Sequence, residues 1–122
     1  MTDVFYDFTV DRVIDGDTFE GTLLIPVPPL KAVLSVNEVR IRVKGADTPE
    51  RGEKYYKEAK EFTARLVNKQ TVKLFVYEKD SFGRLVSDVI IDGQTRTLTQ
   101  LLIDENLAVT WKRGHGNKLQ RE

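Results

Sequence analysis

The sequence predicts a mainly β fold with two helices, of the α+β class, in which five strands close an OB-fold barrel. Three observations predict it: runs of alternating apolar and polar residues, turn signals between those runs, and two stretches with helical spacing. The expected order is three strands, a helix, two strands and a helix, which is typical of a five-stranded Greek-key barrel. The 122 residues fit a single domain, with a core over about 7–111 and a polar tail over 112–122.

The first half of the chain contains the three strands. They are expected at residues 7–14, 18–25 and 38–44, where apolar and polar side chains alternate. The sequence Asp15-Gly16-Asp17 is a hairpin signal between the first two. The third strand has a basic face, formed by Arg40, Arg42 and Lys44.

Residues 26–37 are expected to form a loop, because Pro26, Pro28 and Pro29 lack the N–H group that a strand ladder needs. The segment is unusually apolar for a loop. We therefore expect it either to pack on the barrel or to meet a partner, which includes a second copy of the chain.

The second half predicts a helix at 53–68, strands at 72–76 and 84–91, and a short helix near residue 98. The first helix has an apolar stripe that would face the core, formed by Tyr55, Ala59, Phe62 and Leu66. The second helix begins with a capping box formed by Thr97 and Gln100. Its inward residues would be Leu98, Leu101 and Leu102. Residues 107–111 add a short strand, in which Trp111 is expected to belong to the core.

The composition narrows the possible chemistry. The chain has no cysteine, which excludes disulfides, thiolate ligands and cysteine nucleophiles, and its one histidine, His115, lies in the polar tail. Hydrolytic chemistry would therefore rest on carboxylates, arginines and a hard metal. The net charge is zero, with 19 basic and 19 acidic residues, so a general coat of positive charge is not expected. Two local basic clusters remain, one on the third strand and one in the tail, the latter formed by Lys112, Arg113, Lys118 and Arg121.

No apolar run is long enough to span a membrane, and the N-terminus lacks the features of a signal peptide. We therefore expect a cytoplasmic protein, unless a leader has been removed.

Three segments at turns or strand ends supply acidic residues and arginines: 15–18 carries two aspartates, and 42–50 and 80–84 each combine an arginine with one or more acidic residues. Each has a structural explanation on its own, since Asp-Gly pairs favour turns and Asp-Thr-Pro-Glu suits a helix start. Together they supply what phosphodiester cleavage needs. Arginine forks match phosphate geometry, paired aspartates suit a hard cation such as Ca²⁺, and a further carboxylate could orient or deprotonate water.

These segments carry a family resemblance that spans residues 10–111. The chain resembles the staphylococcal-nuclease-like (thermonuclease) family in Val-Ile-Asp-Gly-Asp-Thr (13–18), Arg-Ile-Arg-Val-Lys-Gly-Ala-Asp-Thr-Pro-Glu (40–50) and Asp-Ser-Phe-Gly-Arg (80–84). The segments 58–62 and 105–108 also fit. The most specific feature is an arginine followed, after four residues, by Asp-Thr-Pro-Glu.

The resemblance implies a calcium-dependent nuclease that hydrolyses single- or double-stranded DNA and RNA and leaves 3′-phosphate ends. It implies that Asp17 and Asp47 bind Ca²⁺ through carboxylates and Thr48 through its main-chain carbonyl. Arg42 and Arg84 would hold the phosphate, and Glu50 would act on the attacking water. Phe82 stands where the family commonly has a tyrosine, so ring stacking on substrate would remain without the hydroxyl contact.

Two other functions fit the same sequence. One is a non-catalytic OB-fold module that binds nucleic acid or protein, which the complete set of site residues disfavours. The other is a phosphodiesterase for a small nucleotide, which the zero net charge would suit.

Overall fold

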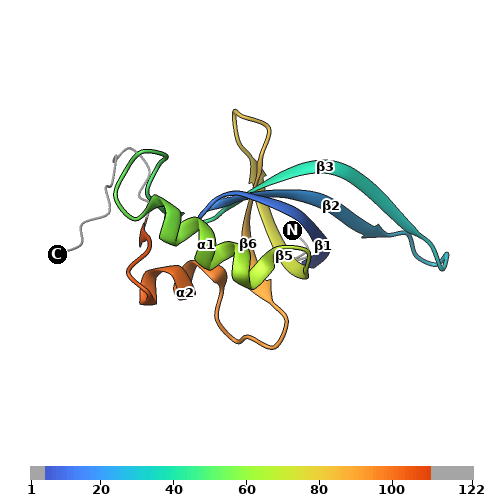
Figure 1. Ribbon diagram of the computed structural model, residues 1–122. Helices are drawn as coiled ribbons and strands as arrows, with labels where there is room; N and C mark the ends of the chain where they lie inside the picture. The colour runs from blue at the N-terminus through green and yellow to red at the C-terminus, as the bar shows by residue number, and fades with distance from the viewer. Residues whose placement is uncertain (1–4, 111–122) are drawn as a thin grey trace.

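The computed structural model describes residues 5–110, in which five strands close a barrel (Figure 1). The strands follow one another around the barrel in the order β1-β2-β3-β6-β5. Their bounds are β1 Phe5–Asp15, β2 Thr18–Pro26, β3 Val33–Val43, β5 Thr71–Lys79 and β6 Leu85–Ile91. Two helices complete the fold, α1 Tyr56–Val67 and α2 Leu98–Asp104. The predicted α+β barrel with two helices is confirmed.

A second, two-stranded ladder pairs β4 Ala46–Asp47 with β7 Val109–Thr110. The predicted short strand at 107–111 is therefore present as β7, and the turn expected after residue 44 contains β4. Pairing with β7 fixes the backbone of Asp47, one of the predicted metal ligands.

The barrel interior is filled by the apolar residues of the alternating strands. Phe8, Phe19, Ile41 and Leu74 are fully buried, and the rings of Phe8 and Phe19 lie 5.7 Å apart. Because side chains alternate across a strand, their sequence neighbours point outward. The outer face of β3 accordingly carries Arg40 and Arg42.

Helix α1 packs beside β1 with a face that differs in part from the predicted stripe. Ala59, Thr63 and Val67 are buried, whereas Phe62 and Leu66 are only partly buried. Tyr55 lies outside the helix as its N-cap, with a left-handed φ of 69°. The predicted stripe is confirmed for Ala59, Phe62 and Leu66, which contact the core, and wrong for Tyr55, because that residue precedes the helix.

Helix α2 begins as predicted. The Thr97 hydroxyl oxygen accepts a hydrogen bond from the Gln100 N–H at 3.2 Å. Leu98 and Leu102 are buried and Leu101 is half-buried, so the predicted leucines face the core.

The prediction of a loop at 26–37 is confirmed for residues 27–32 and wrong for Pro26 and for 33–37, which belong to strands. β2 and β3 continue past the barrel as a long hairpin arm, drawn at the right of Figure 1, and Pro26 pairs with Val33 at its end. The hydrogen bond from Val27 N–H to the Ala32 carbonyl, 3.1 Å long, closes the arm. Proline is tolerated here because Pro26 is the last residue of its strand and the other prolines lie in the turn.

The arm does not pack on the barrel. Its large apolar side chains are exposed, namely Val27, Leu30, Val33, Leu34 and Val36. A partner for this arm stays a prediction. None of the helices in the described part of the chain is long and apolar enough to cross a membrane. The predictions for Trp111, His115 and the basic tail lie outside the described residues.

Candidate active site

Asp17 lies at the turn between β1 and β2 and is 9% exposed. Its carboxylate accepts a hydrogen bond from the Thr18 hydroxyl at 3.0 Å and from the Thr48 backbone N–H at 3.1 Å. The second of these bonds joins the β1–β2 turn to the segment after β4, which is 31 residues away in the sequence. Asp17 is thus held in one orientation at the end of the barrel.

Arg42 links the two predicted metal-binding aspartates. Its Nη1 lies 3.4 Å from Asp17 Oδ2, and its Nη2 lies 3.8 Å from Asp47 Oδ1. The same Nη1 donates to the backbone carbonyls of Val43 at 2.9 Å and Ala46 at 2.6 Å. Arg42 therefore closes the turn between β3 and β4 and brings the two carboxylates to one place.

Asp47 lies in a field of negative charge. Burial raises the pKa of its carboxyl group, and the neighbouring Asp17, Glu50 and Glu53 raise it further, whereas Arg42 opposes the shift. Carboxylates gathered in a partly buried site repel one another unless a cation offsets their charge. Arg42 supplies one positive charge, so the cluster keeps an excess of negative charge.

The donor set at this cluster fits a hard cation. Asp17 and Asp47 offer carboxylate oxygens and the adjoining turn offers backbone carbonyls, which are the ligands that Ca²⁺ prefers. Across residues 5–110, no group of three or more acidic or histidine side chains is arranged to hold a metal ion. A bound cation would therefore need main-chain oxygens or water beside the two aspartates.

Thr48 packs against the β1–β2 turn. A Cβ atom added at Gly16 would lie 3.0 Å from both Thr48 Cγ2 and Thr48 Oγ1, so only glycine fits there without a shift. The Thr48 hydroxyl is buried and has no hydrogen-bond partner among the described residues. Its backbone N–H serves Asp17, so the structure places Thr48 directly beside the predicted metal ligand.

Glu50 lies in the segment between β4 and α1. Its backbone N–H donates to Glu53 Oε1 at 2.7 Å, and its side chain is exposed. Within the described ranges its own carboxylate accepts no hydrogen bond and forms no ion pair. The carboxylate is near enough to Asp47 to raise the pKa of that group.

Arg84 is held in a separate ion pair at the β5–β6 turn. Its Nε lies 2.8 Å from Asp80 Oδ2, while Asp80 Oδ1 accepts the N–H groups of Phe82 and Arg84, each at 2.9 Å. Burial alone would raise the pKa of Asp80, but these hydrogen bonds and the guanidinium hold it below its usual range. The Phe82 ring is 80% exposed and lies 5.1 Å from the Arg84 guanidinium carbon.

The strand pairing relates Arg84 to the cluster. β3 and β6 are parallel neighbours, with Arg42 opposite Val86, and Arg84 lies in the turn directly before β6 begins at Leu85. In the part of the chain that is described, no ion pair joins Arg84 to Asp17 or Asp47. Asp17, Arg42, Asp47 and Thr48 are thus in contact and Glu50 lies in the same electrostatic field, whereas Arg84 is paired with Asp80 outside the cluster.

Two supporting residues were missed in the sequence. The Thr18 hydroxyl and the Glu53 carboxylate each bind a group of the site through a hydrogen bond. Thr18 directly follows Asp17, and Glu53 follows Glu50 by three residues, which is the spacing of a capping interaction. That spacing could have revealed Glu53.

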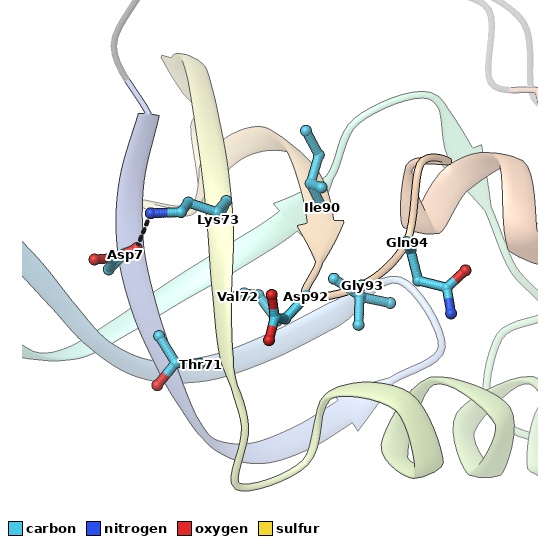
Figure 2. Close-up of a pocket in the computed structure, with 9 residues that line it drawn as sticks. Asp7, Thr71, Val72, Lys73, Ile90, Asp92, Gly93 and Gln94 are labelled. Atoms are coloured by element: carbon cyan, nitrogen blue, oxygen red, sulfur yellow. Dashed lines mark hydrogen bonds and ion pairs between the residues drawn. The ribbon is translucent and has the colours of Figure 1, made fainter.

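A shallow pocket of about 380 Å³ lies elsewhere, on the outer face of β1, β5 and β6 (Figure 2). Among its lining residues Asp7 and Lys73 form an ion pair at 2.7 Å, drawn as a dashed line. Asp92, Gly93 and Gln94 border its other side. None of the predicted site residues lines this pocket, so it is distinct from the carboxylate cluster.

Several known proteins are similar to this chain. One is "Probable staphylococcal-like nuclease CAN1" of Oryza sativa subsp. japonica, 44% identical over 54 residues, which are 44% of this chain and 16% of that protein. "Staphylococcal-like nuclease CAN1" of Arabidopsis thaliana is 33% identical over 69 residues, 57% of this chain and 21% of that protein. The matched segments thus cover about a fifth or less of these relatives.

The family model described as staphylococcal nuclease homologue matches residues 40–122, which is more than half of the chain. That range includes Arg42, Asp47, Glu50 and Arg84, whereas Asp17 precedes it. The closed five-stranded barrel agrees with this assignment. The chain belongs to the staphylococcal nuclease homologue family.

Proposed function

We propose that this protein is a calcium-dependent nuclease that hydrolyses phosphodiester bonds of DNA and RNA and leaves 3′-phosphate products. The observation that carries the proposal is the convergence of Asp17 and Asp47 on Arg42, with Nη–Oδ distances of 3.4 Å and 3.8 Å. Carboxylates can hold a metal ion and a guanidinium can bind phosphate, so this arrangement suits metal-assisted phosphoryl chemistry.

The proposed metal ligands are the Asp17 and Asp47 carboxylates and the Thr48 main-chain carbonyl. The excess negative charge around Asp47 supports this assignment, because a divalent cation would offset it. When bound, Ca²⁺ supplies positive charge that stabilises anionic phosphate oxygens and helps to position water.

The proposed role of the two arginines is to bind the scissile phosphate and to stabilise the charge that develops on it. Guanidinium groups remain charged and match two phosphate oxygens at once. Arg42 is rigidly held by the Val43 and Ala46 carbonyls, which favours preorganisation. Arg84 would also assist the leaving 5′-oxygen, and the exposed ring of Phe82 beside it offers a stacking surface for a base.

Glu50 is proposed to act on the attacking water, as general base or as the group that orients it. Its exposed carboxylate has no partner within residues 5–110, and it lies in the field of the Asp17–Asp47 pair. A base must reach its proton within hydrogen-bonding distance, and an exposed side chain next to the cluster can adjust to do so.

The test is cleavage of single-stranded DNA in buffer with calcium and again with a chelator. Cleavage that requires calcium supports the proposal, and the ends produced are identified by their sensitivity to a 3′-phosphatase. Asp47→Asn should abolish the cleavage seen with calcium, whereas Asp92→Asn, at an exposed turn outside the cluster, is the matched control.

Equal cleavage in both buffers would contradict the metal assignment. If DNA binds but is not cleaved under either condition, the protein is a binding module. The separate ion pair of Arg84 with Asp80 is the observation that favours this second function, because it holds Arg84 away from Asp17 and Asp47.

A thermal shift gives a readout that does not depend on turnover. A ligand that binds only the folded state raises its stability, by about 2.7 kcal/mol at one hundred times the dissociation constant. Calcium should therefore raise the melting temperature of the wild-type protein and leave that of Asp47→Asn unchanged.

A further inference from the structure

Three aromatic residues form a continuous row on the outside of the barrel, away from the core. The rings of Phe5 and Phe75 have centroids 5.3 Å apart, and those of Phe75 and Tyr77 are 4.8 Å apart. Phe5 is 51% exposed and Tyr77 is 47% exposed. We call these three residues, together with Lys44, the aromatic track.

Lys44 joins this row to the candidate active site. Its Nζ lies 4.4 Å from the centroid of the Tyr77 ring. Lys44 follows Arg42 by two residues, and its N–H donates to the Ser87 carbonyl at 2.8 Å, which keeps it beside β6. An unbroken series of contacts therefore runs from Lys44, the residue directly after β3, to Phe5.

The register of the sheet places the track on the same face as Arg42. Phe75 is paired with Asp88, and Arg42 is paired with Val86, two residues before Asp88 on the same strand. Directly paired residues point to the same side of a sheet, as do residues two apart. Arg42 and Phe75 thus share the outer face of the barrel.

The charges around the track leave Lys44 available to an anion. Asp88 accepts the Tyr77 hydroxyl at 2.6 Å, and Asp7 is paired with Lys73, as Figure 2 shows. Lys44 forms no ion pair within the described residues and contacts only a ring face with its ammonium group. An exposed cation–π contact is weak, so a phosphate can compete for this lysine.

We propose that the aromatic track binds the unpaired bases of a single-stranded segment of nucleic acid that extends from the active site. Bases stack on the exposed rings, and the base that covers Tyr77 displaces Lys44, which then contacts the backbone phosphate. A duplex is not a ligand of the track, because pairing and stacking hide the faces of its bases. This proposal rests on the proposed nuclease function and names the preferred form of its substrate.

The test measures binding in a chelator, so that no cleavage intervenes. Fluorescence anisotropy of a labelled thymidine oligonucleotide of about 12 nucleotides is compared with that of a matched duplex at fixed salt. Tyr77→Ala and Phe5→Ala should each weaken binding of the single strand about tenfold and leave duplex binding unchanged. Tyr77→Phe keeps the ring and should restore binding, although it lacks the hydroxyl that reaches Asp88.

The matched control is Leu34→Ala, which removes an exposed apolar side chain from the hairpin arm and should not change binding. The proposal is overturned if the alanine variants bind the single strand like the wild type, or if they lose the duplex equally. It is also overturned if the wild type sediments as a dimer that both substitutions dissociate, because the track is then an interface between copies.

These outcomes separate the track from the nuclease proposal. If the alanine variants lose binding but the wild type never cleaves DNA with calcium, the track stands and the nuclease function fails. If the wild type cleaves but the alanine variants bind normally, the nuclease function stands and the track fails.

Discussion

Arg42 Nη1 lies 3.4 Å from Asp17 Oδ2 while the same nitrogen donates to the backbone carbonyls of Val43 and Ala46. The arginine is therefore part of the architecture of the β3–β4 turn as well as of the site. The other terminal nitrogen of its guanidinium, Nη2, lies 3.8 Å from Asp47 Oδ1. A substitution at Arg42 should consequently affect both turnover and the position of the two aspartates.

Arg42→Ala is expected to lower turnover by at least ~100-fold, the usual scale for the loss of one donor that stabilises developing charge. Steady-state cleavage of single-stranded DNA with calcium measures it. Arg12→Ala removes an exposed arginine that pairs with Glu20 on the adjacent strand β2 and serves as the control. A loss at Arg42 no larger than that of the control would show that Arg42 acts on the turn alone.

Arg84→Ala is expected to lower turnover by a similar factor, at least ~100-fold. An effect below about tenfold would mean that the assignment of Arg84 is wrong. The substitution also removes the ion pair that, with two backbone N–H groups, holds the pKa of Asp80 below its usual range. Carboxyl NMR titration should therefore find the Asp80 pKa higher in Arg84→Ala than in the wild type.

The sign of the accompanying pH effect follows from the depressed pKa of Asp80. Its ionised form is stabilised by folding, so the contribution to stability is complete above the ordinary aspartate pKa of about 3.9. That contribution is lost as the pH falls through the lower pKa of the folded state. In Arg84→Ala the acid-induced loss of stability from this group should shrink, and an unchanged acid profile would contradict the role of the ion pair.

The strands of the barrel could be predicted from the sequence because the alternation of apolar and polar residues shows which side chains face the core. Phe8, Phe19, Ile41 and Leu74 all lie in predicted strands and are all fully buried. The sequence did not predict the hairpin arm, because proline interrupts a strand ladder only where its missing N–H would have to donate to the neighbouring strand. Pro26 sits at the last pair, opposite Val33, where no further N–H is needed.

The contacts of the site were less accessible to sequence reasoning. The motifs identified Asp17, Arg42 and Asp47, but the bond from Thr48 N–H to Asp17 joins residues 31 apart and depends on how the turns pack. The row from Lys44 to Phe5 combines residues of β1 and β5 with the residue that follows β3, and the pairing register brings them together. The alternation of apolar and polar residues within one strand does not reveal how that strand is aligned with its neighbours.

Glu50→Gln is expected to keep DNA binding and to impair cleavage. The amide is nearly isosteric with the carboxylate but cannot accept a proton from water. Anisotropy in chelator measures the binding, and single-turnover cleavage with calcium measures the chemistry. Glu58→Gln, an exposed glutamate in the first turn of α1, is the control. If Glu50→Gln cleaves at the wild-type rate, Glu50 only supports the start of the helix.

The hydroxyl of Thr63 fixes the β1–β2 turn to helix α1, because it donates to the Gly16 carbonyl at 2.6 Å in a fully buried position. Thr63→Val keeps the volume but leaves that carbonyl unsatisfied, which should cost about 1–3 kcal/mol of unfolding free energy. Gly16 precedes Asp17, so calcium affinity should fall as well. Urea denaturation and the calcium-dependent thermal shift measure the two effects.

Thr63→Ser retains the hydroxyl and should recover most of the calcium affinity, which a purely volumetric role of Thr63 would not produce. Thr22→Val is the matched control, since the Thr22 hydroxyl bonds Asn37 at 3.2 Å in an exposed setting. Its effect on stability should stay within about 0.5 kcal/mol. If Thr63→Val loses stability but binds calcium like the wild type, the hydrogen bond supports the fold without positioning Asp17, and the metal ligands are held by Arg42 and Thr48 alone.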